Sequence, residues 1–351
     1  MEQVADSPTR TTNRWAIPLA IVGVLLLAAA AILYWVIVPN NKQLPSDTNV
    51  TRMYDGSAKV ILNSRALAAG DLSNVLLTNV PVSAERTVKV QATDGDVAEA
   101  TDSRTLKAEN GQELGKTEVT YAVNRKTLEA AGEHPDDWQV TPHNGLTISW
   151  PIGAEKKDYS AWVNETQATI PVKFVKEEDK GGVKTYVYQA ESAAAPIKDT
   201  QVLDALPKAL PSTALAGLAA RLPLPDATKA ALARALPSLG GTVPLSYTYQ
   251  VTSTFWVEPT TGIVIDNQRQ EVREATPGAA PLAVPIYDVS SAFSEQSVKD
   301  AAADATDSRD SIQLYSKTLP LILLVLGLLA LLGGLLGWFT RKRRAAVVRS
   351  E

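Results

Sequence analysis

The chain has 351 residues, with 34 basic and 38 acidic side chains and no cysteine. The lack of cysteine excludes disulfides, thiolate metal sites and thiol nucleophiles. The net charge of −4 argues against nucleic acid as a partner, because phosphate binding needs a basic surface. The two short tails hold seven basic and three acidic residues, which leaves 27 against 35 for the long middle segment, a net charge of −8.

A tail over residues 1–14, with Arg10 and Arg14, precedes the first predicted element, a transmembrane helix over 15–38. Its apolar run of about 20 residues is long enough to cross a bilayer. An A-x-A pattern ending at Ala30 also suits a signal peptidase, so cleavage stays open. Because the run exceeds the roughly 7–15 apolar residues of a signal core, we expect the helix to be retained as an anchor.

A polar linker begins at Pro39, and β-branched runs separated by turn signals follow it. Gly and Asn accept the positive φ of tight turns, so Asp94-Gly95-Asp96, Asn110-Gly111 and Lys180-Gly181-Gly182 predict hairpins. The pattern as a whole predicts an antiparallel sheet system. The expected strands are Ala58 to Asn63, Asn74 to Val80, Thr87 to Thr93, Lys116 to Asn124, Leu146 to Ile152, Ala168 to Lys176 and Val183 to Ala190.

Residues 192–239 interrupt the sheet pattern with a run rich in Ala, Leu and Pro. Two short helices are predicted there, Thr213 to Arg221 after Ser212 as N-cap and Ala227 to Leu236 after Asp226. This insertion either caps the sheet with its apolar face, forms a movable lid over an acyl-chain groove, or contacts the bilayer surface. The side chains that would line such a groove are Leu215, Leu218, Leu222, Leu232 and Leu236.

The clearest predicted hairpin starts at Val243, turns at Pro259 to Gly262 and returns along Ile263 to Arg273. Residues 290–317 are Ala-rich and acidic and are expected to form a helix that leads to the membrane. A stripe of aspartates at helical spacing is either a solvated face or a contact for a cation or a basic partner. The stripe consists of Asp300, Asp304, Asp307 and Asp310.

A second transmembrane helix is predicted over 318–339, followed by a basic tail over 340–351. Because basic residues mark the cytoplasmic side at both ends, the two helices are expected to run in opposite directions, with both termini in the cytoplasm. The domain over 39–317 then lies outside the inner (plasma) membrane. Gly333 and Gly337 form a G-x-x-x-G pattern that favours close packing, against the first helix or against another membrane protein.

Candidate catalytic residues are few. The two histidines, His134 and His143, share one loop with Asp136 and Asp137, but their spacing matches no zinc or nucleophile pattern, so we expect ordinary surface histidines. The sequence has no phosphate-loop, dinucleotide, zincin or elbow-serine motif. We therefore expect no enzyme, no cofactor and no metal site. A carbohydrate enzyme built on two carboxylates is the remaining catalytic alternative.

Three stretches carry a family resemblance: Thr120-Tyr-Ala-Val-Asn-Arg-Lys-Thr-Leu128, Trp150-Pro-Ile-Gly-Ala-Glu-Lys-Lys-Asp-Tyr-Ser-Ala-Trp162 and Val257-Glu-Pro-Thr-Thr-Gly-Ile-Val-Ile-Asp266. With an anchor at each end, the chain resembles the actinobacterial porin PorA family over nearly its whole length. The resemblance implies an accessory role in the trafficking or maturation of envelope glycolipids, beside inner-membrane lipid exporters or other envelope-biosynthesis proteins. It implies no catalytic residues.

The second of these stretches presents Trp150, Lys156, Lys157, Tyr159 and Trp162 around a turn. Aromatic rings stack on sugar faces and ammonium groups donate hydrogen bonds, so this cluster could hold a sugar or an anionic head group. A packed turn without a ligand is the alternative.

Together these features predict an α+β fold. A mainly antiparallel sheet, either a sandwich or a curved sheet over helices, forms an extracytoplasmic domain between two transmembrane helices. The expected function is binding of a lipid or glycolipid in envelope assembly or lipid trafficking, with a non-catalytic scaffold for envelope-biosynthesis complexes as the alternative. Pore formation by a single chain is disfavoured, because a membrane barrel needs many lipid-facing strands and no long apolar helix.

Overall fold

The computed structural model describes residues 15–38, 42–63, 66–67, 69–71, 74–222, 224–278 and 282–347, with side chains up to Trp338. These residues form two compact units, one from 1–42 together with 308–351 and the other from 43–307. The predicted tail 1–14 lies outside the described residues, and so do the side chains of the basic tail.

The first unit is a pair of apolar helices. The helix α1 (Ala16–Ile32) continues into the π-helical turn η1 (Leu33–Ile37), and the π-helical turn η3 (Leu314–Thr318) leads into α8 (Leu319–Val347). Two segments are long and apolar enough to cross a membrane, Ala16–Ile37 and a stretch within Glu295–Trp338. The two predicted apolar helices are therefore present.

Glycines bring the backbones of α1 and α8 together. A Cβ atom added to Gly334 would lie 2.6 Å from the Ala20 nitrogen, and one added to Gly23 would lie 2.5 Å from the Leu331 nitrogen. A Cβ atom at Gly327 would meet the Leu27 side chain at 2.9 Å. Because higher residue numbers on α1 face lower numbers on α8, the two helices run in opposite directions, as the sequence predicts.

Close approaches are seen at glycines other than Gly333. A Cβ atom at Gly333 would meet only the Leu19 side chain, at 3.1 Å, and a flexible leucine can move aside. Gly337 is buried. Gly327 and Gly334 are seven residues apart, the spacing of a left-handed helix pair, whereas G-x-x-x-G is typical of a right-handed crossing. Gly327 and Gly334 thus add a seven-residue spacing to the predicted G-x-x-x-G pair.

Replacing Gly334 with Ile is expected to force α1 and α8 apart, because the new side chain would strike backbone atoms of α1. Gly333→Ile is the matched control, since its neighbour there is a leucine side chain. Thermal unfolding of the full chain in detergent should show a clearly lower midpoint for Gly334→Ile than for Gly333→Ile. Equal midpoints would contradict the contact.

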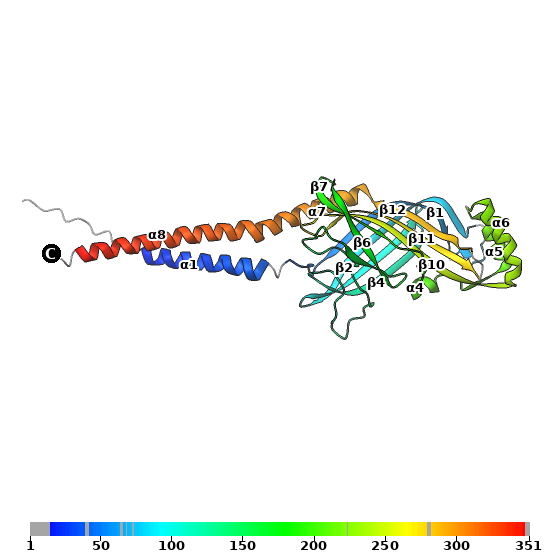
Figure 1. Ribbon diagram of the computed structural model, residues 1–351, viewed down its shortest axis with the longest axis horizontal. Coiled ribbons are helices and arrows are strands. Elements are labelled where there is room, and N and C mark those ends of the chain that lie inside the picture. Colours follow the sequence, from blue (N-terminus) through cyan, green and yellow to red (C-terminus); the bar gives the residue numbers. More distant parts are fainter. Residues whose placement is uncertain are drawn as a thin grey trace, which may run out of the picture. The chain divides into compact units, whose positions relative to one another are not determined.

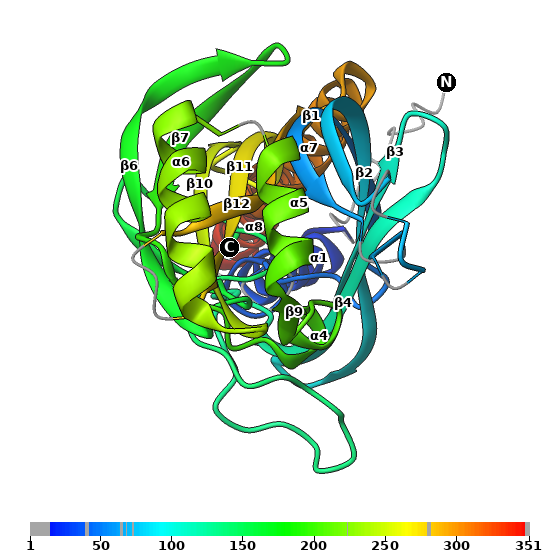
Figure 2. The same cartoon turned by 90° about the vertical axis from the view of Figure 1, so that its right-hand side faces the viewer.

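The second unit is built on one antiparallel sheet, which curls into a half-barrel (Figures 1 and 2). The strands follow the order β4-β3-β2-β1-β12-β11-β10-β7-β6-β5, with β8 and β9 paired to β10. Figure 2 shows β2, β3 and β4 on one side of the curl and β6 and β7 on the other. The strands are β1 (Asn49–Leu62), β2 (Leu76–Asp94), β3 (Val97–Ala108), β4 (Glu113–Asn124), β5 (Tyr159–Val163), β6 (Ala168–Lys180), β7 (Val183–Glu191), β8 (Ala195–Pro196), β9 (Ala209–Pro211), β10 (Thr242–Val257), β11 (Val264–Pro277) and β12 (Val284–Phe293).

The predicted α+β class and the curved antiparallel sheet are confirmed, while the sandwich alternative is not found. All three predicted hairpin turns lie between paired strands, as does the turn from Pro259 to Gly262. The two strands expected at Asn74 to Val80 and Thr87 to Thr93 are one long strand, β2. The strand β3 was not among the predicted ones, since its polar and charged residues hide the usual apolar alternation.

The segment expected as a strand at Leu146 to Ile152 is not one. It joins the sheet through a single bridge, between Leu146 and Ala161. Leu146, Ile148 and Trp150 are nevertheless buried in the largest apolar cluster, which joins both sides of the curl. Every second residue of the segment is buried, as in a strand, although the segment has no strand ladder. This alternation explains why its sequence has a strand-like pattern.

The insertion packs at one end of the sheet, where α5 and α6 lie side by side (Figure 2). It contains α4 (Thr200–Asp204), α5 (Ser212–Arg221), α6 (Asp226–Ala235) and the short 3-10 helix η2 (Leu236–Leu239). Helices α5 and α6 begin one residue earlier than predicted, so Pro211 and Pro225 take the N-cap positions rather than Ser212 and Asp226.

The helix α7 (Glu295–Gln313) begins later than expected, because Ser290 still belongs to β12. Its alanines at 301, 302 and 305 are buried against Trp256 and Ile265. The aspartate stripe is not a uniform free surface: Asp304 pairs with Arg52 on β1 at 2.5 Å.

Candidate functional site

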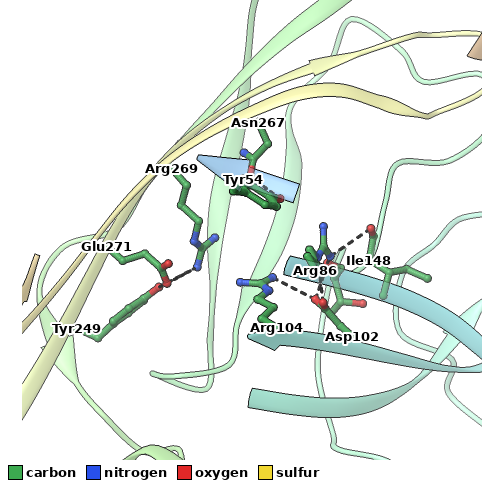
Figure 3. Close-up of polar contacts among 10 residues, drawn as sticks. Tyr54, Arg86, Asp102, Arg104, Ile148, Tyr249, Asn267, Arg269 and Glu271 are labelled. Carbon is green, nitrogen blue, oxygen red and sulfur yellow. Dashed lines mark hydrogen bonds and ion pairs between the residues drawn. The ribbon is translucent and has the colours of Figure 1, made fainter. Parts of the chain in front are cut away.

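The curl of the sheet gathers charged side chains on its inner face (Figure 3). In a strand, residues two apart point to the same side. Asp102 and Arg104 therefore share one face of β3, and Arg269, Glu271 and Arg273 share one face of β11. Three other strands separate β3 from β11 in the sheet, so only its curvature brings the two groups together.

The first ion cluster is centred on Asp102, which is 7% exposed. Its two carboxylate oxygens accept hydrogen bonds from Nε and Nη2 of Arg86, both at 2.9 Å, and one also accepts from Arg104 at 3.1 Å. Burial by itself would raise the pKa of Asp102, but the charges and hydrogen bonds of Arg104 and Arg86 outweigh it and hold the pKa well below its usual value. Arg86 also donates to the carbonyls of Thr147 and Ile148, so it ties the 146–150 segment to β2.

The second ion cluster joins β10 and β11. The Tyr249 hydroxyl donates to Glu271 at 2.6 Å, and Arg269 Nη2 donates to the Tyr249 hydroxyl at 2.8 Å and to Glu271 at 3.1 Å. Burial opposes ionisation of Glu271, but the charge of Arg269 and its hydrogen bond lower the pKa to about 2. Burial also raises the pKa of Tyr249 well above its usual value, so this hydroxyl keeps its proton.

Two cavities lie against these clusters, with volumes of about 160 and 320 Å³. The larger one reaches the range of small-molecule sites. Their linings overlap, so the ion clusters stand at the junction of the two cavities. The residues common to both linings are Ala84, Arg104, Thr117, Glu165, Glu271 and Ser291.

Several buried polar atoms along the smaller cavity lack a hydrogen-bond partner among the described residues. A buried donor or acceptor left unpaired costs about 1–3 kcal/mol, so a cluster of them is a site that a ligand or water can stabilise. These atoms are Thr147 Oγ1, Trp150 Nε1, Trp162 Nε1, Asn164 Oδ1, Ser253 Oγ and Arg269 Nε.

The structure separates the predicted aromatic and basic cluster into two parts. Trp150 and Trp162 line the smaller cavity. Trp150 packs on the rings of Tyr188 and Phe255, with centroid distances of 5.6 and 4.7 Å. The two indoles therefore form the aromatic wall of the cavity.

Lys156, Lys157 and Tyr159 do not line either cavity. Lys156 pairs with Glu177 and lies over the Tyr186 ring. Lys157 pairs with Glu155 at 2.8 Å and lies over the Tyr159 ring, whose hydroxyl accepts a hydrogen bond from the Glu155 amide at 2.9 Å. This part of the stretch has the contacts of a packed turn with exposed ion pairs.

The leucines of the insertion pack against the sheet. Leu222, Leu232 and Leu236 are buried in one apolar cluster with Val60 and Val284, and Leu215 packs against it. Leu215, Leu218, Leu222 and Leu232 border an apolar space of only about 50 Å³. A cavity of about 10–15 Å³ on this kind of measure holds one water molecule, so the space fits only a few waters and is too small for an acyl chain.

The ion clusters were not among the predicted site residues. One signal was present: Arg269, Glu271 and Arg273 alternate along a segment expected to be a strand. Charges at two-residue spacing place several ionised groups on one face, which is unusual for a face turned toward a core. The histidines contribute nothing here: His134 stacks on Trp138, and His143 packs on Tyr121. Among the described residues, no group of three potential metal ligands occurs.

Two of the resemblance stretches meet in space. Ser149, next to the second stretch, donates to the Gly262 carbonyl at 3.1 Å, and the Gly153 amide donates to the Thr260 carbonyl at 3.2 Å. The turn from Pro259 to Gly262 therefore supports the segment that carries Trp150 into the cavity wall.

The chain is similar to several known proteins. A protein named Porin PorA from Corynebacterium resistens is 24% identical over 408 aligned residues, covering 93% of this chain and 96% of that protein. A MaoC-like dehydratase is 11% identical, with 78% of this chain and 82% of that chain covered and a TM-score of 0.14. A double-hotdog protein from Mycobacterium tuberculosis is 10% identical, with 78% and 80% covered and the same TM-score. Such low TM-scores give no information on fold or activity. The sequence model of Porin PorA, however, matches residues 15–336, and the chain therefore belongs to the Porin PorA family.

Proposed function

We propose that the chain is an extracytoplasmic binding protein that takes the polar head group of an envelope lipid or glycolipid into the cavities of its curled sheet. It acts as an accessory factor in cell-envelope assembly or lipid trafficking, together with envelope-biosynthesis proteins of the membrane. The observation that carries the proposal is the cavity lined by ion clusters, two indoles and buried polar atoms without partners.

The lining suits a sugar-bearing or charged head group. Indole faces stack on the apolar faces of sugar rings, and guanidinium and hydroxyl groups donate hydrogen bonds to sugar and head-group oxygens. Acyl chains need a different environment, since the apolar space beside α5 offers only about 50 Å³. We therefore replace the expected apolar groove with head-group binding, in which the acyl chains stay in the bilayer or with a partner.

The membrane helices act as a tether. We place both termini in the cytoplasm and the sheet domain on the outer side of the inner membrane, because the basic residues of both tails favour the cytoplasmic side. Tethering raises the effective concentration of the domain at the membrane surface, so even a weak head-group site is occupied there.

Binding without chemistry fits the electrostatics of the site. A general acid or base works best with a pKa near the operating pH. Asp102 and Glu271 are both held ionised by arginines, with pKa values shifted down rather than up. We propose a binding site rather than a catalytic pair of carboxylates.

Pore formation by the sheet is not part of the proposal. Among the described strands, no ladder joins the end strands β4 and β5. An open edge exposed to lipid would leave backbone N–H and C=O groups unpaired, which costs several kcal/mol for each group. Charged residues such as Lys116 and Glu118 also lie along β4.

Filling the smaller cavity tests the proposal. Ser253 is 3% exposed and lies on the cavity wall, so Ser253→Phe is expected to occupy the space of the ligand. Thr252→Phe is the matched control, because Thr252 is exposed on the opposite side of β10. The full chain, purified in mild detergent from a host with the same envelope type, should carry a lipid or glycolipid in native mass spectrometry.

We expect Ser253→Phe to lose at least 90% of the bound species, roughly the effect of 1.4 kcal/mol on binding, while Thr252→Phe keeps it. A wild-type chain that carries no lipid, or equal loading of both variants, would refute the proposal.

A further inference from the structure

Two like charges face one another inside the cavity. Figure 3 shows the guanidinium groups of Arg104 on β3 and Arg269 on β11 pointing toward each other. Arg104 and Glu271, the carboxylate bound to Arg269, both belong to the lining that the two cavities share. The two cations repel each other, and Asp102 beside Arg104 and Glu271 beside Arg269 offset that repulsion.

Arg104 shares its carboxylate partner with Arg86. Among the described residues, its ion pair is with Asp102 at 3.1 Å, and that carboxylate also accepts two shorter hydrogen bonds from Arg86. The Arg104 side chain is 37% exposed and lines both cavities. Arg269 adds a buried Nε–H without a partner among the described residues.

Three carboxylates of the cavity linings lie close to groups other than Arg104. Glu271 is bound by Tyr249 and Arg269, and Asp199 is held by Asn164 and by the backbone of Gln201 at the start of α4. Glu165 lies 3.9 Å from Arg273. Among the described residues, Asp102 is therefore the carboxylate within ion-pair distance of Arg104.

We propose that the group bound at this junction is an oxyanion, held between Arg104 and Arg269. This inference rests on the proposed function and narrows the head group to one that carries a phosphate or a carboxylate. A guanidinium presents parallel N–H donors in a rigid fork, which fits the paired oxygens of these two groups and fits a neutral sugar hydroxyl less well. Trp150 and Trp162 then contact the uncharged part of the head group.

Two lipids with the same acyl chains but different head groups test the contribution of the head-group charge. Phosphatidylglycerol carries a phosphate, whereas glucosyl diacylglycerol carries a neutral sugar. The full chain in detergent should bind phosphatidylglycerol at least 10-fold more tightly, and Arg104→Met should weaken that binding about 10- to 100-fold, the range for hydrogen bonds to a charged group. Arg234→Met, an exposed arginine of α6, is the matched control and should bind like the wild type.

Inorganic phosphate distinguishes the two sources of the oxyanion. If phosphate alone competes with the lipid in the wild type at millimolar concentration, the junction recognises a free ion as well as a head group. If phosphate does not compete while phosphatidylglycerol still depends on Arg104, the oxyanion comes with the lipid. Both results support the site.

Other outcomes would overturn the oxyanion site between Arg104 and Arg269. If the wild type binds both lipids equally and Arg104→Met changes neither affinity, the oxyanion site is wrong and the proposed head-group function remains. If no lipid binds, the proposed function fails as well. Should Arg104→Met unfold, Arg104→Lys keeps the charge without the fork and should still weaken phosphatidylglycerol binding several-fold; unchanged binding would refute the inference.

Discussion

Replacing Asp102 with Ala is expected to lower the free energy of unfolding by about 3–5 kcal/mol, the loss typical when one partner of a buried ion pair is removed. The Asp102 side chain is 7% exposed and that of Arg86 is 17% exposed. Without Asp102, the acceptors of Arg86 among the described residues are the carbonyls of Thr147 and Ile148, so its buried charge has no carboxylate partner there.

Chemical unfolding of the full chain in detergent, followed by circular dichroism of the sheet, measures this loss. Asp204→Ala is the control, because Asp204 is 75% exposed and lies 3.9 Å from Lys208. A surface pair of that kind contributes about 0–1 kcal/mol. Removing both charges with Asp102→Ala and Arg86→Met should recover part of the loss. A single Asp102→Ala variant as stable as Asp204→Ala would show that Arg86 is not a buried charge.

Replacing Gly262 with Ala is expected to cost about 2–5 kcal/mol. Gly262 has a φ of +75°, which an L-residue adopts at a cost of about 1–2 kcal/mol. An added Cβ atom would also meet the Trp150 carbonyl oxygen at less than contact distance and the Pro151 oxygen at 2.7 Å, and overpacking of this kind costs about 1–3 kcal/mol. Because both contacts are backbone atoms, the 150–151 segment must move.

Gly182→Ala separates the cost of the positive φ from the cost of overlap with the 150–151 backbone. Gly182 has a similar φ of +83°, but an added Cβ atom would meet nothing within 4 Å. This control should therefore lose only the conformational part, about 1–2 kcal/mol. Gly262→Ala should also weaken lipid capture, since the displaced segment carries Trp150 into the cavity wall, whereas Gly182→Ala should not. Equal stability and equal capture in the two variants would contradict the contact between the turn and the segment.

Features that depend on short stretches of chain were predictable from the sequence. Apolar runs of about 20 residues identify candidate membrane helices by length and composition alone. The turns at Asp94-Gly95-Asp96 and Lys180-Gly181-Gly182 were correct, because the positive φ that a tight turn needs is a local property of glycine. The helices over α5 and α6 were found for the same reason, to within one residue.

Features that depend on contacts between distant segments of the chain were not predictable from the sequence. Alternating apolar residues made Leu146 to Ile152 resemble a strand, although its pattern reflects burial against both sides of the curl. The strand β3 was missed for the opposite reason, since its inner face carries Asp102 and Arg104 beside the small residues Ala98 and Ala100. A two-residue period shows that residues share a face but not what that face contacts.

The sequence by itself determined the apolar helices, the antiparallel hairpins and the family of this protein, because each depends on local composition or on motifs along the chain. Only the tertiary structure decided where the candidate site lies. The curl of the sheet brings Arg104 on β3 to face Arg269 on β11 across three intervening strands, and it places Trp150 and Trp162 beside them. Ionic and aromatic contacts between such distant segments depend on the geometry of the whole sheet, so no local pattern in the chain encodes them.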